Sequence, residues 1–294
     1  MNKPALADAL TAPRFEFVSE RAGRLAYYAD AGGEGRPLVL VHSINAAPSS
    51  FEMRPLFEHY RGQRPVYSLD LPGFGHSERG ARPYTPELYA NALADFLRQI
   101  VQQPADVLAL SLSAEFAARA ALATPGQVAS LVVISPTGFS LRPVPNLRSA
   151  RIAHKALTIP LVSQWLYDLV ASRPSIRYFL GRSFVGDVPA EVIDYAHATS
   201  HQPGARHAPL TFLSMQLFTP NAMDQLYGKL TDLPVLAIAD QDPYITFERL
   251  DAFVAGHPNW QRIRLAPNLG LPHWERLPET VAALDRFWST PSAG

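Results

Sequence analysis

Short apolar runs recur along the chain, and segments with helical spacing lie between them. Continuous apolar runs are typical of strands buried on both faces of a parallel sheet, whereas strict alternation is typical of half-buried strands. Two alternating segments, at 15–18 and 24–28, therefore predict half-buried strands. Buried strands are predicted at 37–41, 66–69, 107–110, 131–135 and 235–239, and a last strand at 262–265.

Three segments between these strands are predicted to be helices. Residues 85–101 carry a one-sided apolar stripe, 114–123 are rich in alanine, and 279–288 form a closing helix. Strands that alternate with helices imply an α/β fold, in which a mostly parallel sheet is covered by helices on both faces.

The alternation stops between residues 138 and 230, where prolines separate short amphipathic helical pieces. We interpret this stretch as a helical lid inserted into the core. The predicted organisation is then a first core part at 14–137, the lid at 138–230, and a second core part at 231–290.

Composition narrows the partners and the compartment. Lys+Arg and Asp+Glu are both 26 in 294 residues, so no global field draws the chain to nucleic acid or to an anionic membrane. The absence of cysteine excludes disulfides, zinc–thiolate sites and a cysteine nucleophile, and it fits a reducing compartment. The N-terminus lacks the long apolar stretch of a signal peptide, and no run approaches the ~20 residues that span a bilayer. We expect a cytoplasmic protein with no nucleic-acid and no membrane partner.

The sharpest chemical signal is a serine at a strand–helix junction. The apolar run at 107–110 leads directly into Ser111 and then into the alanine-rich helix. A nucleophile elbow has this layout, and its tight turn requires small residues two before and two after the serine, here Ala109 and Ser113. Ser113 is a rival nucleophile, but Glu115 would then crowd the turn, which favours Ser111. Helix capping remains an alternative role for both serines, with Glu115 as a first-turn acid.

Two loops identify the chain as similar to a known family. A buried strand ends in His42-Ser43-Ile44, and the next is followed by Asp70, Pro72, Gly73, Gly75 and Ser77 in the pattern D-x-P-G-x-G-x-S. These loops resemble those of the α/β-hydrolase fold superfamily, and the resemblance extends from about residue 15 to 288. In that superfamily a backbone N–H near the first loop completes the oxyanion hole. The resemblance thus implicates Ile44, or else Ser43, which replaces the usual glycine.

The acid follows from chain order, which in this superfamily runs serine, acid, histidine. The family pattern of glycine, two variable residues and the acid maps onto 239–242 and selects Asp242 over Asp240. Asp240 is instead expected to cap the helix predicted at 246–255.

The histidine is assigned by elimination. Beyond Asp242 there are two, and His257 reads as part of a surface turn, which leaves His273. Relatives often show Gly-His-x-Pro-x-x-Glu-x-Pro. Aligning that pattern puts Gly270 or Leu271 where histidine belongs, so the loop must run about two residues differently for His273 to reach Ser111.

The resemblance implies a serine hydrolase that needs no metal or organic cofactor. Ser111 would attack an acyl carbon, His273 would act as the base oriented by Asp242, and the Leu112 and Ile44 amides would bind the oxyanion. Ser43 and Trp274, next to these motif residues, are expected to contact the substrate.

A serine nucleophile argues against the haloalkane dehalogenases and epoxide hydrolases of the superfamily, which use aspartate. We therefore expect hydrolysis of a carboxylic ester, thioester or lactone of a medium-sized hydrophobic small molecule. A C–C bond hydrolase or a cofactor-free perhydrolase is the nearest alternative. A non-catalytic binding protein on a degenerate hydrolase scaffold is the alternative from another class, with Ala109, Ser43 and the shifted histidine loop as its signs.

Overall fold

An eight-stranded sheet forms the centre of the computed structural model, which describes residues 5–159 and 162–289. Its strands are β1 (Arg14–Ser19), β2 (Gly23–Asp30), β3 (Leu38–Val41), β4 (Val66–Leu69), β5 (Ala105–Leu110), β6 (Val128–Ile134), β7 (Val235–Ile238) and β8 (Trp260–Ile263). All eight predicted strands are present. β5 and β8 begin two residues earlier than expected, and β6 begins three residues earlier.

The strands lie in the order β1-β2-β4-β3-β5-β6-β7-β8. β1 pairs with β2, and β2 with β4, in antiparallel fashion, whereas every pairing from β4 to β8 is parallel. The carboxyl ends of β3 to β8 therefore meet at one edge of the sheet, which is where ligands bind in open α/β sheets. The segments that follow these strands carry every residue predicted for the site, with His273 and Trp274 in a short helix.

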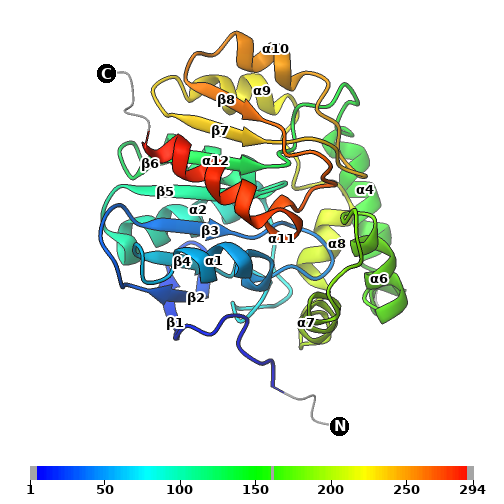
Figure 1. Cartoon of the computed structure of the whole chain (residues 1–294). Coiled ribbons are helices and arrows are strands. Elements are labelled where there is room, and N and C mark those ends of the chain that lie inside the picture. The colour runs from blue at the N-terminus through cyan, green and yellow to red at the C-terminus, as the bar shows by residue number, and fades with distance from the viewer. Residues whose placement is uncertain (1–4, 160–161, 290–294) are drawn as a thin grey trace.

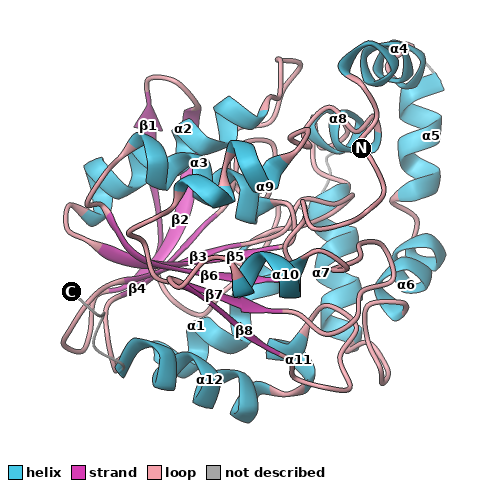
Figure 2. Cartoon of the chain, turned by 90° about the horizontal axis from the view of Figure 1, so that it is seen from above, coloured by secondary structure: helices cyan, strands magenta, loops and turns pink. Residues whose placement is uncertain are grey.

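Helices cover both faces of the sheet (Figure 2). One face packs on η1 (Ser50–Met53), α1 (Arg54–Tyr60) and α12 (Leu277–Ser289), and the other on α2 (Pro86–Phe96), η2 (Leu97–Val101), α3 (Ser113–Ala123) and α10 (Leu250–Ala255). Along β5, Val107 and Ala109 face one core while Leu108 and Leu110 face the other. Each fully buried Val or Leu contributes about 1.5–3 kcal/mol, so a continuous apolar run is the pattern that two covered faces require.

The segment between β6 and β7 is helical, as expected for 138–230. It contains α4 (Leu147–Leu157), α5 (Val162–Val170), α6 (Arg173–Gly181), α7 (Ala190–Ser200), α8 (His207–Leu213), α9 (Ala222–Gln225) and η3 (Tyr227–Lys229). We call α4–α8 the inserted helices. They gather at one end of the sheet, beside the loops that follow the parallel strands (Figure 1). One further short helix, α11 (Pro272–Glu275), precedes α12.

Candidate active site

Ser111 occupies the sharp turn between β5 and α3. Its backbone is left-handed, with φ +57°, and its N–H donates to the carbonyl of Ile134 on the neighbouring strand at 2.8 Å. A residue with a Cβ adopts this conformation rarely, because the side chain then crowds the backbone. The turn leaves Ser111 partly exposed, whereas Ala109 and Ser113 on either side are fully buried. This is the strained geometry that the elbow pattern predicts.

Ser113, the rival nucleophile, is committed to the scaffold. Its side chain is buried, and its hydroxyl donates to the carbonyl of His42 at 2.6 Å. Neither serine caps this helix, because α3 starts from Leu112 without any side-chain cap, although Glu115 does lie in the first turn as that alternative expected. Glu115 is buried as well, and its carboxylate accepts the Thr219 N–H at 2.8 Å. Burial raises the pKa of this carboxyl above its ordinary value.

Glu52 holds the loop that follows β3. Its carboxylate accepts the Ser43 N–H at 2.9 Å, the Ser43 hydroxyl at 3.1 Å and the Asn45 side-chain N–H at 2.8 Å. The hydroxyl of Ser43 thus shapes the loop. Ile44 lies between Ser43 and Asn45 and is almost fully buried. Neither its amide nor that of Leu112 has a hydrogen-bond acceptor among the described residues, as donors for an oxyanion would require.

The motif that begins at Asp70 has a structural role. Its carboxylate accepts the N–H groups of Ser50 at 2.8 Å and His76 at 2.9 Å. Gly75 is required here, because a Cβ at this position would lie 2.0 Å from Asp70 Cγ. His42 ties this motif to the first loop by accepting the Leu71 N–H on Nε2 at 3.0 Å.

Asp242 follows β7, and one of its carboxylate oxygens is well bound. Oδ1 accepts the backbone N–H groups of Tyr244 at 2.8 Å and Ile245 at 3.1 Å. Burial outweighs these two bonds and raises the pKa of Asp242 to about 6. The residue against Oδ2 is Gly270, where a Cβ would lie 2.7 Å from that oxygen.

His273 is bound elsewhere. It lies in α11, fully buried, and its Nε2 donates to the carbonyl oxygen of Glu52 at 2.9 Å, while Nδ1 has no partner among the residues that the structure describes. Burial lowers the pKa of the imidazole to about 4. Trp274 donates its indole N–H to the same carbonyl at 2.9 Å, so this contact, like that of Ser43, is with the scaffold.

The expected hydrogen bonds from His273 to Asp242 and to Ser111 are therefore absent from the described part of the chain. The reason is the register of the loop. Gly270 reaches the carboxylate, and the helical turn that begins at Pro272 then directs His273 towards Glu52. Both pKa shifts follow from this separation. A carboxylate paired with an imidazolium has a lowered pKa and raises that of its partner, which is the opposite of both shifts.

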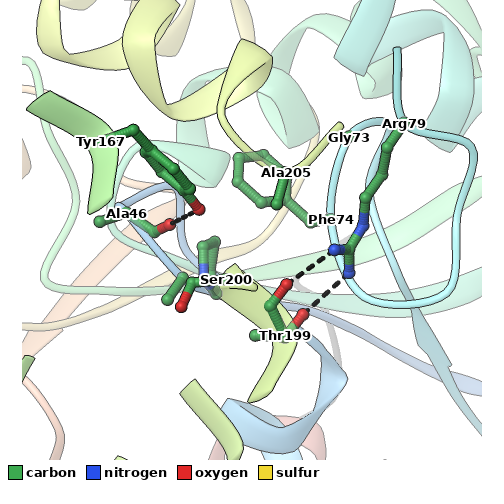
Figure 3. Close-up of a pocket in the computed structure, with 10 residues that line it drawn as sticks. Ala46, Gly73, Phe74, Arg79, Tyr167, Thr199, Ser200 and Ala205 are labelled. Atoms are coloured by element: carbon green, nitrogen blue, oxygen red, sulfur yellow. Dashed lines mark hydrogen bonds between the residues drawn. The ribbon is translucent and has the colours of Figure 1, made fainter. Parts of the chain in front are cut away.

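The inserted helices contact the loop that follows β3 around a small pocket (Figure 3). The hydroxyl of Tyr167, on α5, donates to the carbonyl of Ala46 at 3.1 Å. Opposite it, the Arg79 guanidinium donates to the carbonyl of Thr199 at 2.7 Å and to its hydroxyl at 2.9 Å. Desolvation lowers the pKa of Arg79. These bonds fix α5 and α7 above the strand ends. Within the described ranges, no three His, Asp or Glu side chains are grouped to hold a metal.

A family model described as the alpha/beta hydrolase family matches residues 38–284. The chain belongs to this family. The match includes both motif loops, the elbow and the segment that carries Asp242 and His273.

Two esterases are among the curated proteins that this family member resembles in sequence. A pimeloyl-[acyl-carrier protein] methyl ester esterase of Nitrosospira multiformis is 31% identical over 120 residues, which are 39% of this chain and 44% of the relative. An esterase of Mycobacterium tuberculosis is 30% identical over 138 residues, 40% of this chain and 46% of the relative. The chain thus spans less than half the length of either relative.

Solved structures share the fold at low sequence identity. A serine hydrolase involved in carbazole degradation superposes with a TM-score of 0.73 at 14% identity, covering 94% of this chain and 99% of that one.

Sequence reasoning missed two residues of this alpha/beta hydrolase site. Glu52 belongs to no motif, and only its place after a polar loop could have drawn attention to it. Gly270 could have been found from the sequence, because aligning the family pattern at Glu275 and Pro278 puts Gly270 or Leu271 at the histidine position.

Proposed function

We propose that the chain is a serine hydrolase that cleaves a carboxylic ester of a hydrophobic small molecule, with Ser111 as nucleophile. The observation that carries the proposal is the left-handed backbone of Ser111 at the end of a buried strand. This conformation exposes a hydroxyl at the end of β5. It also leaves the Leu112 amide beside that hydroxyl, where the amide can donate to an oxyanion. The esterases among the relatives support the ester as the bond attacked.

His273 is the histidine that chain order offers as the base, with Asp242 as its partner. In this role it would remove the Ser111 proton and return it to the leaving alcohol. To reach the serine, its Nε2 must leave the Glu52 carbonyl, since that nitrogen is the one engaged in a hydrogen bond. The acyl-enzyme would then be released by a water activated in the same way.

A second candidate is a binding protein on the hydrolase scaffold. It is favoured by the contact of Gly270 with Asp242 and by the bond that holds His273 to Glu52. Such a protein keeps the strained serine but lacks a proton acceptor beside it, so it turns over no ester.

The two candidates are separated by labelling and turnover together. The purified chain, Ser111→Ala and Ser113→Ala are treated with a fluorophosphonate and with a series of p-nitrophenyl acyl esters. A hydrolase labels at Ser111, turns over esters, and loses both properties in Ser111→Ala but not in Ser113→Ala. Labelling that persists in Ser111→Ala removes this residue from its role. Absence of turnover in a folded wild-type chain favours the binding protein.

A further inference from the structure

The outer surface of the inserted helices is apolar and exposed. Among the described residues, thirteen large hydrophobic side chains are exposed, and eight of them lie between 141 and 185. These eight are Leu141, Ile152, Ile159, Trp165, Leu169, Tyr178, Phe179 and Val185. Apolar side chains scattered singly need no explanation, but a concentration of this kind marks an interaction site. We call it the α4–α6 surface, and its helices line one outer side of the molecule (Figures 1 and 2).

Helical spacing puts the exposed side chains on the outward faces. On α5, Tyr167 points inward and is buried, whereas Trp165 and Leu169, four residues apart, are 68% and 56% exposed. On α4, Ala150 is buried and His154 is half-buried. Residues spaced by three and four share one helix face.

The same face of α4 is strongly basic. Arg148, Arg151 and Lys155 recur at spacings of three and four, and Ile152 lies between them, 64% exposed. Long basic side chains next to apolar ones are typical of helices that lie in a membrane interface, where the stems are buried and the charges reach the headgroups.

The charge of this surface is local. Residues 141–185 hold seven Lys or Arg and a single acid, Asp168, although the whole chain is balanced at 26 against 26. Arg173 is paired with Asp194, and Glu248 accepts the Leu141 N–H at the edge of the surface. Within the described ranges, no ion pair neutralises Arg148, Arg151 and Lys155 on α4, Arg177 on α6, or Arg182 directly after α6.

From this combination of charge and apolar exposure we infer that the α4–α6 surface docks onto an anionic lipid bilayer. The unneutralised cations match the charge of acidic headgroups, and Trp165, Tyr178 and Phe179 are the side-chain types that enter the headgroup region. No helix among the described residues is long and apolar enough to span a membrane. The helices would therefore lie in the plane of the interface. This inference departs from the expectation of no membrane partner, which rested on the balanced charge of the whole chain.

The test uses the full chain and vesicles of two compositions, one pure phosphatidylcholine and one containing phosphatidylglycerol as well. Co-sedimentation is expected with the anionic vesicles alone, and it should weaken as salt screens the charges. Replacing Arg148, Arg151 and Lys155 by glutamine keeps the helix and is expected to lower partition by about 100-fold. Equal binding to both vesicle types, or unchanged binding of this variant, overturns the inference.

A matched pair of variants isolates the apolar contribution. Ile152→Ala with Trp165→Ala should weaken binding, whereas Phe15→Ala with Val18→Ala should not, although Phe15 and Val18 are also exposed, on β1. Thermal melting verifies that each variant is folded. If the chain instead self-associates through Ile152 and Trp165 and ignores vesicles, a second copy covers this surface and the inference fails. No readout uses activity, so failure of the proposed ester hydrolysis would leave this result intact.

Discussion

Gly270 stands against the free carboxylate oxygen of Asp242, where a Cβ would approach Oδ2 to 2.7 Å. Its φ of +119° is also one that only glycine adopts readily. The acid of the expected triad therefore faces backbone, and no imidazole is bonded to it within the described residues.

Gly270→Ala is expected to lower the free energy of unfolding by about 2 kcal/mol or more, from strain and contact together. Denaturant titration measures the change. Gly35→Ala shares the positive φ but has open space around it, and Gly80→Ala has neither feature, so the three losses should rank in that order. Equal losses at Gly270 and Gly35 would mean that Asp242 does not restrict this position.

Asp242→Asn is expected to stabilise the chain at neutral pH. The folded protein holds the proton of Asp242 up to about pH 6, whereas the unfolded chain releases it near 3.8, so stability is lost as pH rises through this window. Asparagine still accepts the two backbone N–H groups but cannot ionise. The variant should gain up to about 3 kcal/mol over wild type above pH 6 and little below pH 4.

Unfolding titrations at several pH values test this expectation. Asp240→Asn controls for the loss of one negative charge from the same loop. A gain that is independent of pH would contradict the raised pKa of Asp242.

His273→Gln should have the reverse pH profile. The buried imidazole has a pKa of about 4, below the 6.5 of the unfolded chain, so wild type loses stability as pH falls between these values, by up to about 3 kcal/mol. Glutamine retains a donor for the Glu52 carbonyl and does not titrate, which should flatten the acid limb of the stability curve. His257→Gln is the matched control for removal of one histidine.

The same variant reports on catalysis. If His273 is the base, His273→Gln should lower kcat by at least about 100-fold while the chain stays folded at neutral pH. A variant with unchanged kcat would limit His273 to its structural bond with Glu52.

Glu52→Gln is expected to loosen the loop that carries Ile44. The carboxylate accepts three bonds from Ser43 and Asn45, and an amide cannot accept all of them. A displaced oxyanion donor should lower kcat by about 10-fold or more and change KM little, because the interaction is made chiefly in the transition state. Glu58→Gln, on α1, removes a comparable carboxylate that binds Thr11 and Arg61. A variant in which KM changes and kcat does not would contradict the positioning role of Glu52.

The sheet could be predicted because burial on two faces leaves a continuous apolar run in the sequence. β5 is a clear case, since all six of its residues are buried. The elbow could be predicted as well, because its turn admits only small residues two before and two after Ser111, here Ala109 and Ser113. Helix ends were less accurate. The helix expected at 246–255 begins at Leu250.

The histidine loop could not be predicted from chain order. Elimination selects a residue type but fixes neither the register of the loop nor the partner of the ring. That partner is the carbonyl of Glu52, which is 221 residues away in sequence. Every residue has a backbone carbonyl, so no sequence motif indicates which one accepts this bond.

The left-handed backbone at Ser111 lowers the folding stability of the chain at the position where the hydroxyl is exposed. A side chain there costs about 1–2 kcal/mol that glycine would not. Ser111→Gly should consequently give a chain that unfolds at a higher temperature and has no hydroxyl at the elbow. If Ser111 is the nucleophile, this loss of folding stability is the cost of keeping a hydroxyl at the elbow.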